Sequence, residues 1–184
     1  MAMMHYDYVI IGAGAAGLQL ALQMVEDEYF SDKSILLLDK DLKDKNDRTW
    51  SYWEKGEGRF DDIIHRSWSR AEFKSESLDR TLDLSPYIYK TLRGIDFYEY
   101  ARTQLHGRIT WLNEEVVNIS HGHPNVVQTE TGAYQTEIIF DSRIQSEYND
   151  QAENFNTLLQ HFLGWEVTFD KPVFQPDTFL TVSY

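Results

Sequence analysis

The sequence predicts an α/β fold built on a parallel sheet, and its first forty residues carry the main evidence. The β-branched run of residues 8–11 is followed at once by GAGAAG, residues 12–17. A helical pattern comes next, and a second apolar run, residues 35–38, ends at Asp39. The residues expected on the buried helix face are Leu18, Ala21, Leu22, Val25 and Tyr29. Strand, glycine turn, helix, strand and acid in this order are typical of a Rossmann-like dinucleotide-binding domain.

Each glycine of this motif has a separate physical role. Gly12 permits the tight turn, Gly14 lets the backbone approach a pyrophosphate, and Gly17 lets the helix pack against the sheet. The positive end of the helix dipole would face the phosphates. Asp39 follows Gly17 at about the 20-residue spacing of a carboxylate that binds a ribose hydroxyl, and it would repel the 2′-phosphate of NADP. The motif therefore predicts binding of FAD or NAD.

Length and composition limit the class of protein. The chain has 184 residues, of which 42% are hydrophobic and 14% aromatic, enough for one domain or slightly more with a packed core. Its net charge of -13 opposes binding to nucleic acid or anionic lipid through a positive field. It has no cysteine, which excludes disulfides and thiolate metal sites. No signal peptide or run of about 18 apolar residues is present, so we expect a cytoplasmic protein that meets membranes only peripherally.

Residues 44–58 are polar, aromatic and poorly periodic, and therefore predict a long loop. Long ordered loops usually carry function or connect domains. In that case Arg48, Thr49 and Trp50 would line a cofactor or an apolar substrate. The alternative is a surface loop with its aromatic side chains tucked beneath it.

Two strand patterns and a helix follow this segment. Residues 68–81 predict one or two strands, and residues 87–91 predict another. Asp96 as N-cap and Glu99 three positions later predict a capping box at the start of a helix. The residues expected on its buried face are Phe97, Ala101 and Leu105.

A β-meander is expected after the helix. Residues 109–119 predict a strand, and residues 126–129 and 134–140 predict a hairpin that turns at Thr131-Gly132. Such a meander after a helix is the usual crossover of two-domain flavoproteins.

The resulting domain organisation has one interruption. We place the dinucleotide-binding domain at residues 1–143, with an insertion at 44–90, and the start of a mixed-sheet substrate domain at 144–184.

His121 and His123 lie at a predicted turn. Two histidines without further ligands do not make a metal site, so no metal is expected.

Glu166 stands out in the stretch LLQHFLGWEVTF. With the two-residue period of a strand, Leu163, Trp165, Val167 and Phe169 share one face, and Glu166 lies on the other. One interpretation is a half-buried strand whose polar face meets water. The other is an acid held at a reaction site.

Six stretches, taken in order, resemble the flavin-dependent lycopene cyclases of bacteria and plants. They are DYVIIGAGAAGLQLA, LLLDKD, NDRTWSYWE, RGIDFYEYAR, FDSR and LLQHFLGWEVTFDKPVFQPD. The resemblance covers nearly the whole chain but only the first half of family members, and the ending FLTVSY departs from the family. It therefore implies a chain that is truncated relative to the family.

The resemblance also implies a chemistry. Family members bind FAD, are thought to need it reduced, with NADPH as reductant, and cyclise the ψ ends of lycopene to β-ionone rings without net redox change. Glu166 matches the proposed acid–base glutamate of the family, beside Trp165 in the substrate pocket. Arg93 and Val116 are expected cofactor contacts.

Partners and alternatives follow from the same resemblance. The expected partner is lycopene, and its insolubility implies peripheral contact with the cytoplasmic membrane; no nucleic acid or protein partner is expected. Two alternative functions are also compatible with the sequence. The chain could be another FAD-dependent oxidoreductase, such as a monooxygenase or polyprenyl reductase, or an inactive truncated flavin-binding fragment.

Overall fold

The chain divides into two compact units. In the computed structural model, residues 3–143 and 167–182 are described. The first unit comprises residues 1–44 and 98–157, and the second comprises residues 45–97 and 158–184. One boundary between them falls within helix α2 (Gly94–Leu105). The domain limits expected from the sequence, 1–143 and 144–184, stay a prediction.

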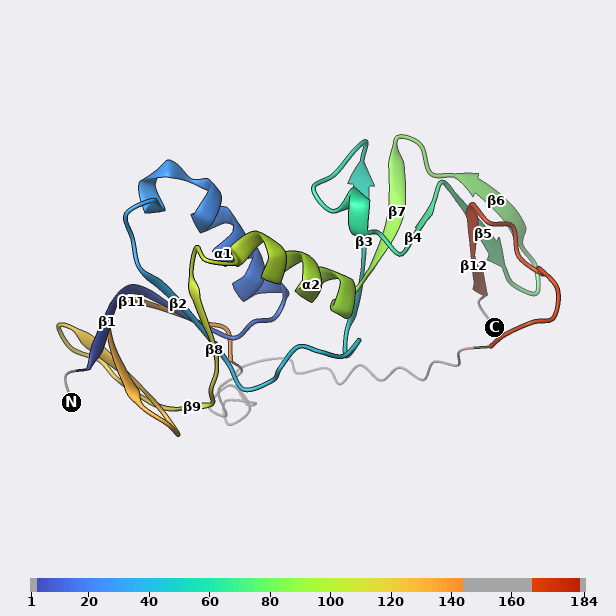
Figure 1. Cartoon of the computed structure of the whole chain (residues 1–184). Helices are drawn as coiled ribbons and strands as arrows, with labels where there is room; N and C mark the ends of the chain where they lie inside the picture. Colours follow the sequence, from blue (N-terminus) through green and yellow to red (C-terminus); the bar gives the residue numbers. More distant parts are fainter. Residues whose placement is uncertain (1–2, 144–166, 183–184) are drawn as a thin grey trace, which may run out of the picture. The chain divides into compact units, whose positions relative to one another are not determined.

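The first unit is built on a six-stranded sheet in the order β8-β2-β1-β11-β10-β9 (Figure 1). The central strands pair in parallel, with Tyr8 opposite Ile35 and Ile11 opposite Asp141, while β9, β10 and β11 form an antiparallel meander. The strands are β1 (Met4–Ile11), β2 (Ile35–Asp39), β8 (Thr110–Asn113), β9 (Val116–Ser120), β10 (Asn125–Thr129) and β11 (Ala133–Asp141). The predicted Rossmann-like α/β fold with its β-meander is confirmed.

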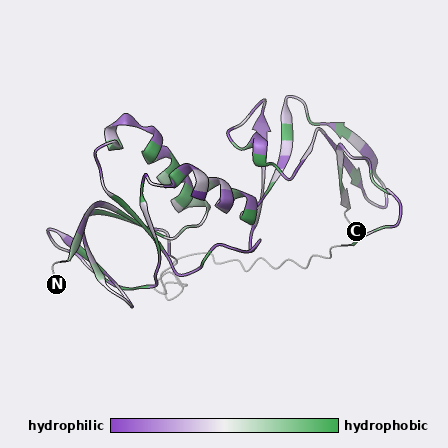
Figure 2. Cartoon of the chain, in the orientation of Figure 1, coloured by the Kyte–Doolittle hydropathy of each residue, from purple (hydrophilic) through white to green (hydrophobic). Residues whose placement is uncertain are grey.

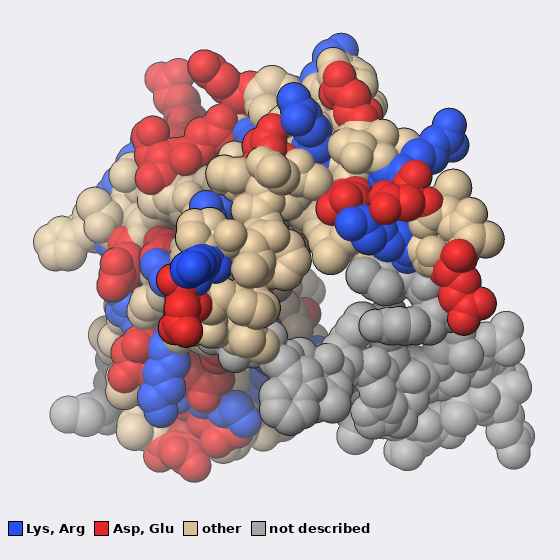
Figure 3. All heavy atoms as spheres, turned by 90° about the vertical axis from the view of Figure 1, so that its right-hand side faces the viewer, with Lys and Arg blue, Asp and Glu red and all other residues tan. Residues whose placement is uncertain are grey.

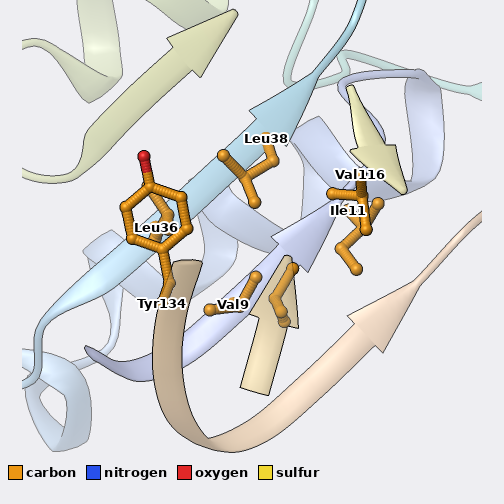
Figure 4. Close-up of a cluster of buried hydrophobic side chains, with 7 residues drawn as sticks. Val9, Ile11, Leu36, Leu38, Val116 and Tyr134 are labelled. Atoms are coloured by element: carbon orange, nitrogen blue, oxygen red, sulfur yellow. The ribbon is translucent and has the colours of Figure 1, made fainter. Parts of the chain in front are cut away.

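Strands β1 and β2 are hydrophobic over most of their length because both of their faces are covered (Figure 2). On one face, Val9 and Ile11 of β1 meet Leu36 and Leu38 of β2 and side chains of the meander, among them Tyr134 (Figure 4). On the other face lies helix α1 (Ala15–Glu26), whose Gly17, Leu18, Ala21 and Leu22 are buried. This two-sided core fixes the end of β1, where the glycine motif begins.

The predicted ends of one helix and one strand in this unit were wrong. Helix α1 ends at Glu26, and Tyr29 is 66% exposed in a 3-10 turn (Glu28–Phe30). Asp27 starts that turn, because its carboxylate accepts a hydrogen bond from the Tyr29 amide at 2.9 Å. The single strand expected at 109–119 is divided into β8 and β9.

The break between β8 and β9 has a polar cause. Glu114, between the two strands, accepts hydrogen bonds from the Thr129 hydroxyl at 2.6 Å and the Tyr134 hydroxyl at 3.0 Å. Burial opposes the charge of Glu114, but these hydrogen bonds outweigh it, and its pKa lies below the usual range. Burial and the hydrogen bond to Glu114 together raise the pKa of Tyr134 to about 12.

The second unit contains two three-stranded sheets, in the orders β3-β7-β4 and β12-β5-β6. A 3-10 turn (Asp61–Ile63) lies between β3 and β4. Strand β12, near the end of the described chain, pairs in parallel with β5. The strands are β3 (Thr49–Lys55), β4 (Arg66–Trp68), β5 (Arg70–Lys74), β6 (Asp79–Asp83), β7 (Tyr87–Arg93) and β12 (Thr178–Val182).

The prediction of one long loop at residues 44–58 was wrong, because β3 occupies its centre, residues 49–55. Side chains along β3 alternate between exposed and half-buried, so Trp50 and Tyr52 face inward while Ser51 and Trp53 face outward. Both faces carry aromatic or polar residues, which hid this two-residue period in the sequence. The strands expected at 68–81 and 87–91 are confirmed as parts of β4, β5, β6 and β7.

Helix α2 also begins differently from the prediction. It starts at Gly94, so Asp96 lies in the first turn and is not the N-cap. The Asp96 carboxylate instead binds the Arg93 guanidinium. The predicted buried face of Phe97, Ala101 and Leu105 is confirmed.

The structure describes only the last part of the strand expected around Glu166. Residues 144–166 lie outside the described residues. Residues 167–169 are described and do not form a strand, so the prediction was wrong for them.

Two surface properties bear on partners. Within residues 3–143 and 167–182, no helix combines the length and the apolar character needed to cross a bilayer. On the face drawn in Figure 3, acidic and basic side chains lie side by side over the described atoms.

Candidate functional site

The glycine motif forms a tight turn at the end of β1. Gly12 has a φ of +103°, a conformation that side chains rarely adopt, and its amide donates to the Leu38 carbonyl at 2.8 Å. A Cβ on Gly12 would also overlap the hydroxyl of Ser142. That hydroxyl is fixed by donation to the Ile11 carbonyl at 2.9 Å. Glycine is therefore required here by both backbone and packing.

Gly17 and Gly14 differ in how much space surrounds them. A Cβ on Gly17 would overlap the Gly12 carbonyl oxygen and lie 3.3 Å from Cγ2 of Ile10, so helix and strand touch at this point. A Cβ on Gly14 would meet no atom within 4 Å, and its φ of -81° suits any residue. Nothing within the described protein demands glycine at this position. The open space beside Gly14 is where a ligand would approach the backbone.

Helix α1 begins beside this open space without a capping side chain. Gly14 is its N-cap, and the first turn contains no acidic residue. The first amides of a helix have no partner within the helix and carry partial positive charge. This arrangement suits a phosphate group.

Asp39 lies beside the glycine motif, at the end of the neighbouring strand β2. Its side chain is 9% exposed at the end of β2. One carboxylate oxygen accepts from the Ala13 amide at 2.5 Å, and the other accepts from the Asp41 amide at 2.7 Å. The structure thus brings Asp39 and the three predicted glycines together, and their contact with a cofactor stays a prediction.

Val116 begins β9 and is buried against the cluster that contains Ile11. Its carbonyl accepts from Nη1 of Arg143 at 2.8 Å, and the same guanidinium pairs with Asp141 at 2.8 Å. Burial opposes the charge of Asp141, yet the bonds from Arg143 keep the pKa of this carboxyl below its usual range. Residues of the FDSR stretch therefore connect the end of β11 to the start of β9 through hydrogen bonds. The sequence did not predict this role.

Arg48, Thr49, Trp50 and Arg93 lie together at one end of the β3–β7 pair in the second unit. Thr49 is paired with Arg93, and the Gly94 amide donates to the Arg48 carbonyl at 2.7 Å. Trp50 packs edge-on against Phe97, with ring centres 5.6 Å apart.

Arg93 makes a two-point contact with Asp96, at 2.6 Å and 2.8 Å. These hydrogen bonds hold the pKa of Asp96 below its usual range. The corner of β3, β7 and α2 is therefore well ordered by internal contacts, and its role toward a cofactor or substrate stays a prediction. The other two predicted site residues, Trp165 and Glu166, lie outside the described residues.

Lys90 is a buried charged residue that the sequence pattern did not single out. It is 3% exposed, and its ammonium donates to Glu54 at 2.8 Å, Asp61 at 2.5 Å and the Gly56 carbonyl at 3.2 Å. Burial lowers the pKa of Lys90, but the bonds from the two carboxylates more than reverse this, and the pKa is raised. All three donors have acceptors, which indicates a structural tie for the turn after β3. A lysine within the mostly apolar strand YIYKTL is the signal that could have found it.

An aromatic cluster covers the opposite face of the β3–β7–β4 sheet. Tyr89 lies at its centre, with ring-centre distances of 4.7 Å to Trp53, 5.8 Å to Trp68 and 4.9 Å to Phe179. A pocket of about 560 Å³ adjoins it, lined by Trp68, Phe179 and Phe174 among others. Flat aromatic side chains of this kind suit an apolar, unsaturated ligand.

Comparisons with solved structures show the fold. The flavin-dependent brominase Bmp2 matches 80% of this chain at 13% identity with a TM-score of 0.55, and the match covers 40% of that protein. The p-nitrophenol 4-monooxygenase PnpA of Pseudomonas putida matches 76% of this chain at 14% identity with a TM-score of 0.59, covering 41% of that protein. The chain thus spans about two fifths of the length of these structures. No curated protein matches it.

A third solved structure, the halogenase PltM in complex with phloroglucinol and FAD, matches 79% of this chain and 36% of its own, at 15% identity and a TM-score of 0.55. At the level of sequence, residues 7–184 match the family described as lycopene cyclase protein. This match includes the glycine motif, Asp39 and the segment that carries Glu166. The chain therefore belongs to the lycopene cyclase protein family.

Proposed function

We propose that this chain is the FAD-binding part of a flavin-dependent lycopene cyclase. The observation that carries the proposal is the open space beside Gly14, at the uncapped start of α1 and next to Asp39. No packing contact of the described protein requires glycine at this position, and the missing side chain leaves room for a ligand. The family match supplies the reaction class.

The described residues fit the adenosine diphosphate half of FAD. Amides at the start of α1 would hold the pyrophosphate, and the Asp39 carboxylate would accept hydrogen bonds from the ribose. Val116 would contribute to the adenine side, with its carbonyl position set by Arg143. FAD in the solved halogenase complex supports this assignment at the level of fold.

The proposed reaction is a cyclisation without net redox change. Glu166 would donate its proton to the terminal double bond of a lycopene ψ end, leaving a carbocation that the neighbouring double bond attacks to form the ring. A base then takes a proton from the ring and restores neutrality. A carboxyl beside Trp165 in a site without water would stay protonated until this step. Bound reduced flavin, with NADPH as its reductant, would supply negative charge that stabilises the cation.

The substrate is proposed to be an insoluble polyene reached at the surface of the cytoplasmic membrane. The aromatic cluster of the second unit supports an apolar substrate, because π faces pack well on conjugated chains and attract cations. Arg48, Thr49 and Trp50 are proposed as a separate set of pocket residues, because Trp50 lies on the face of β3 opposite to this cluster.

Cofactor binding is tested by titrating the purified chain with FAD and following the quenching of flavin fluorescence. Asp39→Asn should weaken FAD binding about tenfold, because it removes a charge-assisted hydrogen bond. Asp32→Asn is the matched control, since it removes an exposed carboxylate that precedes the start of β2, at the end of this strand opposite to Asp39. Equal affinity in Asp39→Asn and wild type would contradict the proposed site.

Cyclisation is tested in lycopene-accumulating cells, with the chain joined to the remainder of a family member. Glu166→Gln should keep flavin binding and lose cyclised carotenoid. Cyclised product at the wild-type level would rule out Glu166 as the acid.

A further inference from the structure

Lys43 has an unusual backbone conformation. Among residues 3–143 and 167–182, it is the only non-glycine residue with a positive φ, at 54°. This left-handed conformation is unfavourable for a residue with a Cβ, and such strain persists where the surrounding structure holds it, often at ligand sites. Glycine or asparagine would satisfy the backbone better.

Contacts on both sides hold this turn in place. Immediately before Lys43, the Leu42 carbonyl accepts a hydrogen bond from Arg102 of helix α2. Arg102 is itself stacked on the ring of Trp111, 4.4 Å from its centre. On the β2 side, Asp41 donates its amide to Asp39 at 2.7 Å. The turn therefore directs the Lys43 side chain back toward the end of β2.

The Lys43 ammonium is largely buried yet lacks close partners. Its side chain is 9% exposed, and Nζ lies 3.5 Å from a carboxylate oxygen of Asp39 and 3.5 Å from one of Asp41. It also lies 5.7 Å from the ring centre of Tyr98. Charge-assisted hydrogen bonds are usually about 2.7–2.9 Å long, so these ion pairs leave the N–H donors underused.

The position of this ammonium relates it to the glycine loop. The Asp39 oxygen near Lys43 is the one that accepts from the Ala13 amide at 2.5 Å. Asp39 and Asp41 together would repel an anionic nucleotide, and Lys43 is the cation that faces both. Lys40 also follows β2, but its side chain is 62% exposed, and its ammonium lies 3.6 Å from Glu115.

We propose that Lys43 is a nucleotide-contacting residue, which donates a hydrogen bond to the adenosine diphosphate half of the dinucleotide and offsets the charge of Asp39. This inference rests on the proposed dinucleotide binding. It explains why a lysine is kept in a backbone conformation that suits glycine or asparagine. Ligand binding would replace two long ion pairs with a shorter contact.

The test is calorimetric titration of the full chain with ADP. Lys43→Met keeps the apolar stem and should weaken ADP binding about 10- to 100-fold, the loss expected for one charge-assisted hydrogen bond. Lys43→Arg should restore affinity to within about threefold of wild type, since it restores the charge. Lys40→Met is the matched control and should change affinity less than about twofold, as expected of an exposed charge.

A thermal unfolding measurement separates binding from stability. Lys43→Asn should unfold at the wild-type temperature or up to about 4 °C above it, because asparagine tolerates the left-handed conformation. It should bind ADP as weakly as Lys43→Met. A purely structural lysine would instead lower the unfolding temperature when replaced.

Three outcomes would overturn the inference while leaving the dinucleotide site intact. They are ADP affinity in Lys43→Met within twofold of wild type, no recovery in Lys43→Arg, and a lower unfolding temperature in Lys43→Asn. Failure of the wild-type chain to bind ADP or FAD at millimolar concentration would refute the proposed dinucleotide site, and this inference with it.

Discussion

Adding one methyl group at Gly14 or at Gly17 should separate ligand binding from folding. At Gly14 the new Cβ meets no protein atom within 4 Å, so Gly14→Ala costs only the small loss of a good N-cap, about 1 kcal/mol. At Gly17 the new Cβ overlaps the Gly12 carbonyl and lies 3.3 Å from Ile10. Overpacking against rigid backbone costs about 3 kcal/mol, and the better helix propensity of alanine returns about 1 kcal/mol.

These values give measurable differences. For a chain of this size, Gly17→Ala should lower Tm by about 4–8 °C, and Gly14→Ala by no more than about 4 °C. Gly14→Ala should nevertheless weaken FAD binding about 10- to 100-fold, because its methyl group occupies the space through which a phosphate would reach the α1 amides. Differential scanning fluorimetry without ligand and fluorescence titration with FAD measure the two effects. Gly14→Ala binding FAD within twofold of wild type would refute the reasoning.

Two further predictions concern stability. Lys90→Met should lower the free energy of unfolding in urea by about 2–4 kcal/mol, because it leaves the carboxylates of Glu54 and Asp61 without their shared cation. Lys55→Met, at an exposed lysine, is the control. A loss below about 1 kcal/mol for Lys90→Met would contradict a stabilising role for Lys90. Tyr134, whose pKa is raised to about 12, contributes stability that is complete below its ordinary pKa of about 10 and lost as pH rises through 12. The difference in unfolding free energy between wild type and Tyr134→Phe should therefore shrink from pH 10 to 12, and a constant difference would argue against the bond to Glu114.

The elements around the glycine motif could be predicted because their patterns have a single interpretation. The run YVII, the spacing of the three glycines and the run ending at Asp39 each require one local conformation, and the sheet then brings them together. The hairpin of β10 and β11 was predictable for the same reason, from alternation on both sides of a glycine turn. Short-range periodicity was sufficient in these cases.

The remaining features depend on contacts that periodicity does not encode. Strand β3 was hidden because Trp50 and Trp53 point to opposite faces, and only pairing with β7 makes this stretch a strand. Asp96 matched a capping box, but Arg93 competes for its carboxylate. The turn at Lys43 follows from the hydrogen bond of Arg102, which is distant in sequence, to Leu42. In the first and third cases a contact between distant segments decides the local structure, and in the second a neighbouring side chain three residues away does.

The pairing of β1 with β11 has a consequence for how the protein is made. β1, near the amino terminus, acquires this parallel neighbour only when residues 134–141 are available, and Ser142 then seats against the Ile11 carbonyl. Contacts between such distant segments form slowly, and an unpaired strand edge is prone to aggregation in the meantime. During synthesis the glycine loop therefore cannot reach its final structure until the FDSR stretch has left the ribosome. Until then β1 can pair only with β2. Any shorter nascent chain would carry the nucleotide motif in its sequence without being able to complete the site.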